Sequence, residues 1–508
     1  QKALANLPSN EEETQFPTEV ERYNQLLISL HDEGRFEEML DISKKAIQKY
    51  PNLILGWNYY GAAQRALGNL EAALSAFKRV IEIKPTFSDG HTNLGAVFQD
   101  RNEFEIAIEC YQTAICLKQN NAKAFNNLGT AYKAKGDLKN SIEAYKKAIV
   151  IKPDYAEAYN NMGNALKQLG RFDESIDSFK KAIELKPDYA DGYNNYGRTL
   201  MLKNDFKKAF ELMEWRLELE ELNFIPLNTL KPRWDGHNNQ KVFLLREQGI
   251  GDIIMFSSMI PELYSNIENV IFECDQKLVS LFKRSFPNNI RYVTDRIEVS
   301  ASDYDSHIPI GSLPLHFRKN LIDFQNTSSG WLQADTEIVD TIRKNLTKKK
   351  SKIIIGISWK TISLLTQSHL RNIELEVLLK PLKKLDASFV NLQYGEVSEE
   401  ISNLKIDLGM EVLEIPGIDL YNDIDGLASV ISACDYVISI DNVTPHLAGA
   451  LGVNTKLLLP FTADDRWGTE TNKSYLYESI DIYRQSVYGD WSKPLAEMAK
   501  DLEILFRN

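Results

Sequence analysis

The chain has 508 residues, 43% of them hydrophobic, and a net charge of −12. A chain of this length is expected to form about three domains. Its acidic balance, without a strongly basic tract, argues against nucleic acid or an anionic membrane as the partner. No apolar stretch reaches the roughly 18 residues of a membrane span, and the four scattered cysteines suit a reducing compartment. We therefore expect a cytoplasmic protein without a membrane span.

Residues 1–19 are polar and acidic, and we expect them to be disordered. Residues 20–223 repeat with a period of 34 residues, marked by Gly61, Gly95, Gly129, Gly163 and Gly197. A small residue and then an aromatic follow most of these glycines, and prolines close most units. Small residues let two helices approach closely, and proline ends the second helix. The pattern resembles the tetratricopeptide repeat, which implies an all-α superhelix of about six units.

Four successive units carry asparagine at their sixth position. At about 100° per residue, this position points away from the core-facing side of the unit's first helix. An amide offers a donor and an acceptor, so it can pair with the main chain of an extended peptide. This half resembles the protein O-linked N-acetylglucosamine transferases, which have a matching ladder. We expect peptide binding by four residues: Asn93, Asn127, Asn161 and Asn195.

The alternative for these asparagines is a solvated helix face inherited by duplication. On such a face, replacing asparagine with alanine should cost no stability, because alanine is the better helix former. The repeats are also a candidate surface for a homodimer.

The second half loses the 34-residue period after a linker at 224–240. Short apolar runs now alternate with helical stretches, as in parallel sheets covered on both faces. We predict strands at 241–246, 269–275, 351–359, 388–393, 436–441 and 455–460. The lysine-rich run at 345–352 divides this half into two Rossmann-like α/β domains, 241–346 and 347–508. Two such domains facing each other form a cleft at the carboxyl ends of their strands.

Three phrases follow predicted strands in this half. "EQGIGD" carries Asp252 at the start of a helix, where it is either a functional carboxylate or only a helix cap. "SWKTISLLTQSHLRN" supplies two cations, Lys360 and Arg371, suited to phosphate. "SIDNVTPHLAGALG" places a helix N-terminus, an anion site, after Asp441. His446 in that helix points either toward a ligand or back into the fold.

Together with "HIPIGSLP", "NLQYG" and "LLLPFTADDRW", these phrases resemble the heptosyltransferase-related (family nine) glycosyltransferases, in the bacterial branch fused to tetratricopeptide repeats. The resemblance implies a GT-B fold, inversion at the sugar carbon and no metal. It also implies an acceptor-side domain followed by a nucleotide-sugar domain. The family's Gly-Asp pair falls on Gly251 and Asp252, and its Asp-x4-His motif falls on Asp441 and His446. The expected donor-binding residues are Lys360, Arg371, Gln393, Asp441, Asn442, Thr444 and His446. Asn442 stands where the family often has threonine.

The leading interpretation is an inverting, metal-independent glycosyltransferase with Asp252 as general base. It uses a nucleotide sugar, needs no cofactor, and modifies Ser or Thr of a protein held by the repeats, with flagellin or another surface protein as a candidate acceptor. One alternative is transfer to a glycan or lipid precursor, with the repeats used for assembly. Another is a binding scaffold with a degenerate transferase half.

Overall fold

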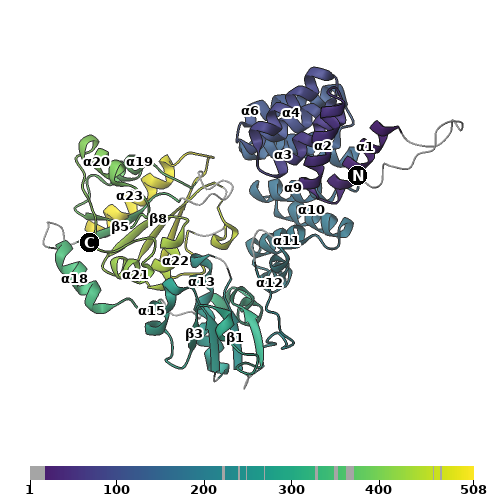
Figure 1. Ribbon diagram of the computed structural model, residues 1–508. Coiled ribbons are helices and arrows are strands. Elements are labelled where there is room, and N and C mark those ends of the chain that lie inside the picture. The colour runs from purple at the N-terminus through teal and green to yellow at the C-terminus, as the bar shows by residue number, and fades with distance from the viewer. Residues whose placement is uncertain are drawn as a thin grey trace, which may run out of the picture. The chain divides into compact units, whose positions relative to one another are not determined.

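The computed structural model describes residues 18–219, 224–237, 241–247, 249–267, 269–325, 330–347, 353–361, 371–461, 463–469 and 472–507. The chain forms two compact units, Gln1–Leu169 and Gly170–Asn508 (Figure 1). Most of the segment predicted to be disordered lies outside the described residues. Its end is helical, however, because Thr18 caps the first helix through a capping box with Glu21.

The first unit consists of antiparallel helix pairs. The third, fifth, seventh and ninth helices begin at 54, 88, 122 and 156, so their starts follow the 34-residue period of the sequence. The helices are α1 (Glu19–Asp32), α2 (Phe36–Lys49), α3 (Ile54–Ala66), α4 (Leu70–Ile83), α5 (Ser88–Asp100), α6 (Phe104–Leu117), α7 (Ala122–Ala134), α8 (Leu138–Ile151) and α9 (Ala156–Gln168).

The periodic glycines sit where the two helices of a pair touch. A β-carbon built on Gly129 would lie 2.7 Å from the Tyr145 ring, and one on Gly95 would lie 2.8 Å from the Tyr111 ring. Both rings are fully buried. The glycine and the aromatic of each repeat are therefore one packing device, as the spacing in the sequence indicates.

The repeats continue into the second unit with α10 (Phe172–Leu185), α11 (Ala190–Leu202) and the shorter α12 (Phe206–Met213), followed by a 3-10 turn, η1 (Glu214–Glu218). Phe206 of α12 packs on Phe324 and Tyr475, with ring centroids 4.8 and 5.6 Å apart. The last repeat is thus anchored to the α/β part of its own unit.

The first sheet is parallel, with strand order β3-β2-β1-β4. Its strands are β1 (Lys241–Leu245), β2 (Asn269–Glu273), β3 (Arg291–Val293) and β4 (Ser306–Pro309). Its helices are α13 (Ile250–Phe256), α14 (Ile260–Asn266), α15 (Gln276–Ser285), α16 (Pro314–Phe317) and α17 (Ile322–Gln325).

The second sheet is also parallel, with strand order β10-β9-β8-β5-β6-β7. Its strands are β5 (Ile354–Ser358), β6 (Ser388–Asn391), β7 (Val412–Leu413), β8 (Tyr436–Ile440), β9 (Thr455–Leu459) and β10 (Ile480–Arg484). Its helices are α18 (Thr336–Thr347), α19 (Leu375–Leu379), α20 (Ser398–Asp407), α21 (Ile424–Ser432), α22 (Val443–Ala450) and α23 (Ser492–Arg507). All six predicted strands are present, so the C-terminal half has the parallel sheets of an α/β protein.

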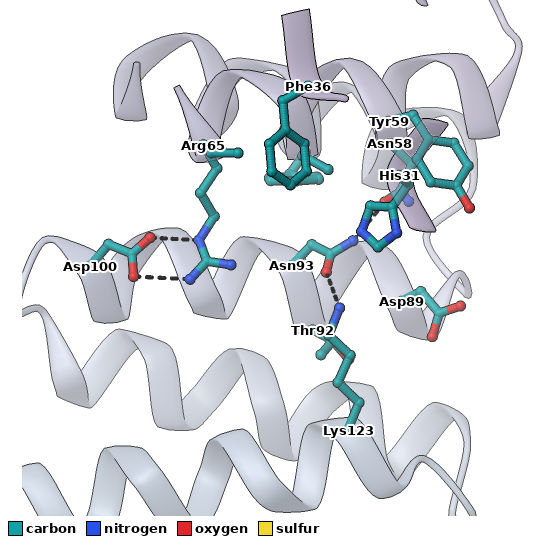
Figure 2. Close-up of a pocket in the computed structure, with 13 residues that line it drawn as sticks. His31, Phe36, Asn58, Tyr59, Arg65, Asp89, Thr92, Asn93, Asp100 and Lys123 are labelled. Atoms are coloured by element: carbon teal, nitrogen blue, oxygen red, sulfur yellow. Dashed lines mark hydrogen bonds and ion pairs between the residues drawn. The ribbon is translucent and has the colours of Figure 1, made fainter. Parts of the chain in front are cut away.

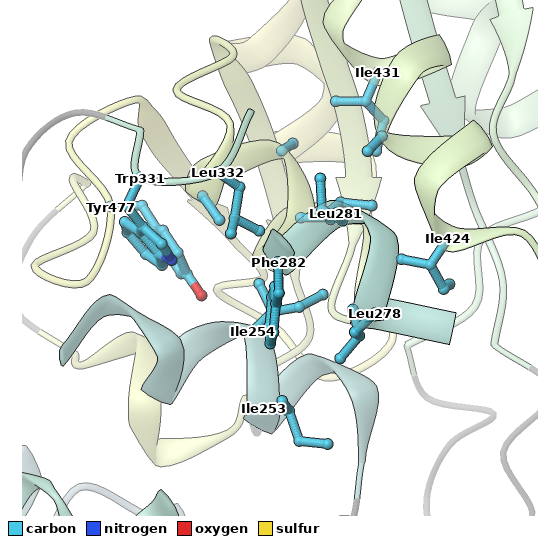
Figure 3. Packing of buried hydrophobic residues seen from close by; sticks show 14 of the residues in the cluster. Ile253, Ile254, Leu278, Leu281, Phe282, Trp331, Leu332, Ile424, Ile431 and Tyr477 are labelled. Carbon is cyan, nitrogen blue, oxygen red and sulfur yellow. The ribbon is translucent and has the colours of Figure 1, made fainter. Parts of the chain in front are cut away.

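Helices from the two sheets share one hydrophobic core. Figure 3 shows Ile253 and Ile254 of α13 and Phe282 of α15 in the same cluster as Ile424 and Ile431 of α21. α18 precedes the predicted domain boundary at 346/347 but packs against α21. This common core brings the helix that follows β1 next to the helix that follows β8. Among the described residues, no helix is both long and apolar enough to cross a membrane.

Candidate functional site

Asp252 lies in the first turn of α13, directly after β1. Gly249, with a φ of 85°, makes the turn between strand and helix and is the residue at the helix N-cap. The Asp252 carboxylate instead reaches across to Arg466, whose Nη1 lies 2.5 Å from Oδ1. The ion pair shows that this side chain faces the second sheet, a geometry that the helix-cap alternative does not explain.

Asp441 follows β8 and is buried. Its Oδ1 accepts a hydrogen bond of 2.9 Å from the indole of Trp467, and Arg371 Nη1 lies 3.5 Å from its Oδ2. Burial and the nearby charge of Asp464 raise the pKa of Asp441. Asp441 therefore orients two side chains that surround the site.

His446 is buried in the first turn of α22. Its Nδ1 lies 2.8 Å from the Tyr477 hydroxyl, and its ring stacks on Trp467 with centroids 5.0 Å apart. Burial, and then the charge of Arg466, lower the pKa of His446 to about 3, so the imidazole is neutral at neutral pH. A β-carbon on Gly251 would lie 3.1 Å from this ring, so the glycine lets α13 approach α22 closely. The geometry places His446 as a packing and orienting residue.

The polar residues at the start of α22 stabilise the loops around it. Asn442 is the N-cap, since its Oδ1 accepts from Thr444 N at 2.9 Å, and its Nδ2 donates to Ser358 Oγ at 2.8 Å. Gln393 is buried, and its Oε1 accepts from the backbone nitrogens of Trp359 and Lys360 at 2.9 Å each. Thr444 Oγ1 is buried without a hydrogen-bond partner among the described residues.

The two predicted phosphate-binding cations already have protein partners. Lys360 pairs with Glu400, and its Nζ lies 3.4 Å from the Glu396 carbonyl oxygen. Arg371 pairs with Asp441. A phosphate would therefore compete with these carboxylates for both cations.

Sequence reasoning missed the residue at the centre of this site. Arg466 Nε donates to Asp464 Oδ1 at 2.9 Å, so its guanidinium joins Asp464 to Asp252. Arg466 and Asp464 occur together in "PFTADDRW", which follows β9. The phrase was one of those that resemble the glycosyltransferase family, but nothing in the sequence pairs Arg466 with Asp252, which lies 214 residues away.

The predicted peptide-binding asparagines are half-buried rather than fully exposed. Asn93 Nδ2 donates to Asn58 Oδ1 of the preceding repeat at 2.9 Å, and Asn161 Nδ2 donates to Asn126 Oδ1 at 3.1 Å. These bonds link neighbouring repeats. A helix face that only contacts solvent would make no such bonds. Asn127 is half-buried in α7. Asn195 is half-buried in α11 of the second unit, where its carbonyl accepts from Thr199 Oγ1 at 2.9 Å.

A cavity of about 510 Å³ opens beside Asn93 in the first repeats (Figure 2). The aromatic rings of Phe36 and Tyr59 are part of its lining. Arg65 crosses it to pair with Asp100 through two hydrogen bonds of 2.5 and 3.0 Å. Lys123 Nζ lies 3.3 Å from Asn93 Oδ1. The cavity therefore combines apolar, charged and amide groups.

Comparison with known proteins supports the prediction of tetratricopeptide repeats in the first half of the chain. Models of the tetratricopeptide repeat match residues 57–87, 97–136, 129–170 and 156–189. This part of the chain is therefore built of tetratricopeptide repeats.

Protein FlbA of Caulobacter vibrioides is 28% identical over 295 residues, which cover 53% of this chain and 48% of FlbA. The match thus spans about half the length of that relative. Among solved structures, MamA is 27% identical and covers 32% of this chain and 94% of its own, with a TM-score of 0.29. A tetratricopeptide-repeat protein of Thermus thermophilus is 20% identical, with coverages of 36% and 99% and a TM-score of 0.34.

Proposed function

We propose that the chain is an inverting GT-B glycosyltransferase that moves a sugar from a nucleotide sugar to Ser or Thr of a protein. The observation that carries this proposal is the meeting of two helices from different sheets. α13 brings Asp252, and α22 brings His446, to the same Arg466–Trp467 pair. Ligands of open α/β sheets bind beyond the carboxyl ends of the strands, where both helices begin.

In the proposed reaction, Asp252 is the general base. Arg466 holds Oδ1, while Oδ2 makes no hydrogen bond with the described residues. Oδ2 takes the proton of the acceptor hydroxyl as its oxygen forms a bond to the anomeric carbon. The bond from that carbon to the diphosphate oxygen breaks, and its electron pair leaves with the diphosphate.

The charge of the leaving diphosphate is met by protein groups in this proposal. Lys360, Arg371 and the first turn of α22 lie at carboxyl ends of neighbouring strands β5 and β8. The Thr444 hydroxyl, which has no hydrogen-bond partner in the part of the chain that the structure describes, is a further donor in that turn. His446 contributes no charge, since its imidazole is neutral.

The proposed acceptor is an extended polypeptide segment lying in the repeat groove, in the cytoplasm. Flagellin or another surface protein is a candidate from the family resemblance alone. One observation favours the competing scaffold function. Asp252, Lys360 and Arg371 all form ion pairs within the protein, so none of the three charges is free for a substrate. Activity measurements separate the two.

The test begins with a thermal-shift panel of UDP-, ADP-, GDP- and CMP-sugars, followed by mass spectrometry of Ser/Thr polypeptides incubated with the donor that binds. Asp252→Asn should lower turnover by about 10²–10⁴-fold, because asparagine has a similar shape but is no base. Asp425→Asn is the matched control. It removes a carboxylate from a bidentate ion pair with Arg284, at 2.7 and 2.8 Å, away from Asp252.

Near-normal turnover of Asp252→Asn would reject the catalytic role. A comparable loss of turnover in Asp425→Asn would mean that breaking any ion pair of this kind lowers turnover, so the loss in Asp252→Asn would not indicate a general base. Absence of binding and transfer with every donor would favour the scaffold.

A further inference from the structure

The turn that carries Arg466 is held from two sides. It comprises Asp464 and the 3-10 turn η8 (Asp465–Trp467), after β9. On one side, Arg466 reaches Asp252 at 2.5 Å. On the other, Arg198 of α11 donates through Nη2 to Asp464 at 3.0 Å and through Nε to Asp465 at 2.7 Å.

Asp464 uses both carboxylate oxygens in this arrangement. Oδ2 accepts from Arg198, and Oδ1 accepts from the backbone and side-chain nitrogens of Arg466 at 3.1 and 2.9 Å. Although burial opposes it, the charges of Arg466 and Arg198 hold the pKa of Asp464 well below its ordinary value. The carboxylate therefore stays ionised and bonds both arginines at once.

The same turn also contacts two other residues of the candidate site. Trp467 is 1% exposed, stacks on His446 and donates to Asp441. Asp465 is 7% exposed, and loss of Arg198 would remove from its buried carboxylate the hydrogen bond that Nε donates. A movement of α11 would thus be transmitted through Arg466 to Asp252 and through Trp467 to His446 and Asp441.

We propose that Arg198, in the last helix pair of the repeats, is a positioning residue that fixes the η8 turn and through Arg466 orients Asp252. Its effect on turnover rests on the proposed glycosyltransferase function, whereas its effect on the turn does not. The proposal gives α11 a role in setting the site, in addition to any role in holding an acceptor.

The packing around α12 supports this assignment. Phe206 contacts Tyr475, which lies in the segment between η8 and β10, and Phe324 contacts the same ring with centroids 5.0 Å apart. The last repeat thus reaches the segment after β9 through an aromatic cluster as well as through ion pairs. Two separate contacts restrain the same part of the chain.

The test compares Arg198→Met, Arg198→Lys and Lys203→Met in the full chain. Arg198→Met removes the charge but keeps most of the length. Arg198→Lys keeps the charge but lacks the fork that bonds two carboxylates. Lys203→Met is the matched control, because Lys203 is the C-cap of the same helix and pairs with Asp173 rather than with the η8 turn.

The first readout is hydrogen exchange of the amides of Arg466 and Trp467, both of which bond to Asp464. Arg198→Met should accelerate this exchange about tenfold, with Arg198→Lys in between and Lys203→Met unchanged. The second readout is transfer kinetics. Arg198→Met should lower kcat about tenfold, because Arg466 in a loosened turn no longer holds Asp252 in one orientation.

Wild-type exchange rates in a folded Arg198→Met variant would overturn the proposal, as would equal acceleration in Lys203→Met. Faster exchange in Arg198→Met, together with no transfer from any donor by the wild-type chain, would uphold the positioning of the turn and reject the proposed glycosyltransferase function. Faster exchange with unchanged kcat would overturn the link from the turn to Asp252.

Discussion

Lys133 carries a charge that no described residue neutralises. It lies at the twelfth position of its repeat unit, where Arg65 of an earlier unit pairs with Asp100. Arg65 and Asp100 are 35 residues apart. The residue 35 positions after Lys133 is Gln168, which has no carboxylate to pair with the lysine. Burial, and then the charge of Lys167, lower the pKa of Lys133 to about 8.

This lowered pKa has a definite sign for stability. Between about pH 8 and its ordinary pKa of 10.5, Lys133 is neutral in the folded chain but protonated in the unfolded chain. Folding stability therefore rises with pH through this window. Below pH 8 the folded chain bears the cost of a poorly solvated charge.

We predict that Lys133→Met raises Tm at pH 7 by roughly 2–4 °C, corresponding to about 1 kcal/mol after allowance for partial solvation. The gain over wild type should shrink as pH rises from 7 to 10. Scanning calorimetry across this range measures it. Lys139→Met, at an exposed position of α8, is the control and should show no such trend. A pH-independent gain in Lys133→Met would contradict the assigned charge effect.

At this scale, the sequence indicates residue types better than partners. Asp252, Asp441 and His446 could be selected because each lies in a phrase that follows an apolar strand and resembles a glycosyltransferase motif. Arg466 could not be matched to Asp252, because tertiary packing alone brings the two segments together. The neutrality of His446 likewise follows from burial against Trp467 and Tyr477, which no local pattern encodes.

The helix pairs of the repeats depend on the absence of a side chain at one position. In Gly129→Ala, the new methyl group would meet the Tyr145 ring at 2.7 Å and the Ser141 carbonyl oxygen at 3.0 Å. We expect a loss of about 1–3 kcal/mol, which exceeds the gain in helix propensity. Urea unfolding of the full chain measures it.

Gly56→Ala is the matched control for that substitution. Its nearest neighbour would be the end of the Ile47 side chain at 3.0 Å, with no backbone atom among the three nearest contacts. The cost should therefore be smaller. Equal costs at both positions would show that the ring contact is not what requires glycine.

The bonds between asparagines give a second prediction for these elements. Asn93→Ala leaves the buried Asn58 carboxamide without its donor, at a cost of about 1–3 kcal/mol. Adding Asn58→Ala should cost less than its own single effect, since both partners are then gone. A double-mutant cycle measures the coupling, and strict additivity would contradict the bond. The expectation that alanine costs no stability here thus changes, because the structure places Asn93 in contact with the preceding repeat.

The elements differ in how well the sequence predicts them. The 34-residue period gives helix starts at 54, 88, 122 and 156 because each repeat packs in the same way. The strands β3, β4, β7 and β10 were not predicted. β3 and β7 have three and two residues, and β4 and β10 contain polar residues within the strand. Short or mixed strands give no continuous apolar run to detect.

At the scale of the molecule, the proposed function divides the work between two kinds of site. The α/β sheets would bind the nucleotide sugar, and the repeats would hold the polypeptide that receives it. Substitutions in the groove of the first unit should therefore change acceptor use without changing donor affinity. Three asparagines of that unit serve this test: Asn93, Asn127 and Asn161.

We predict that the threefold Asn→Ala variant loses its preference for long polypeptides. At roughly 0.5–1.5 kcal/mol per main-chain hydrogen bond, three bonds are worth about 10- to 10³-fold in kcat/KM. The loss should affect an extended Ser/Thr polypeptide of some thirty residues, about 100 Å at 3.3 Å per residue, but not a tripeptide too short to span the repeats. Donor affinity by calorimetry should be unchanged.

The control carries alanine at three exposed positions of the second helices, also spaced by 34 residues: Lys78, Gln112 and Lys146. It tests whether any three substitutions in the repeats disturb transfer. Both variants are assayed below the Tm of the less stable one, because the asparagine variant also loses bonds between repeats. If the asparagine variant keeps the wild-type preference for the long polypeptide, the ladder serves to join repeats, and the acceptor is held elsewhere.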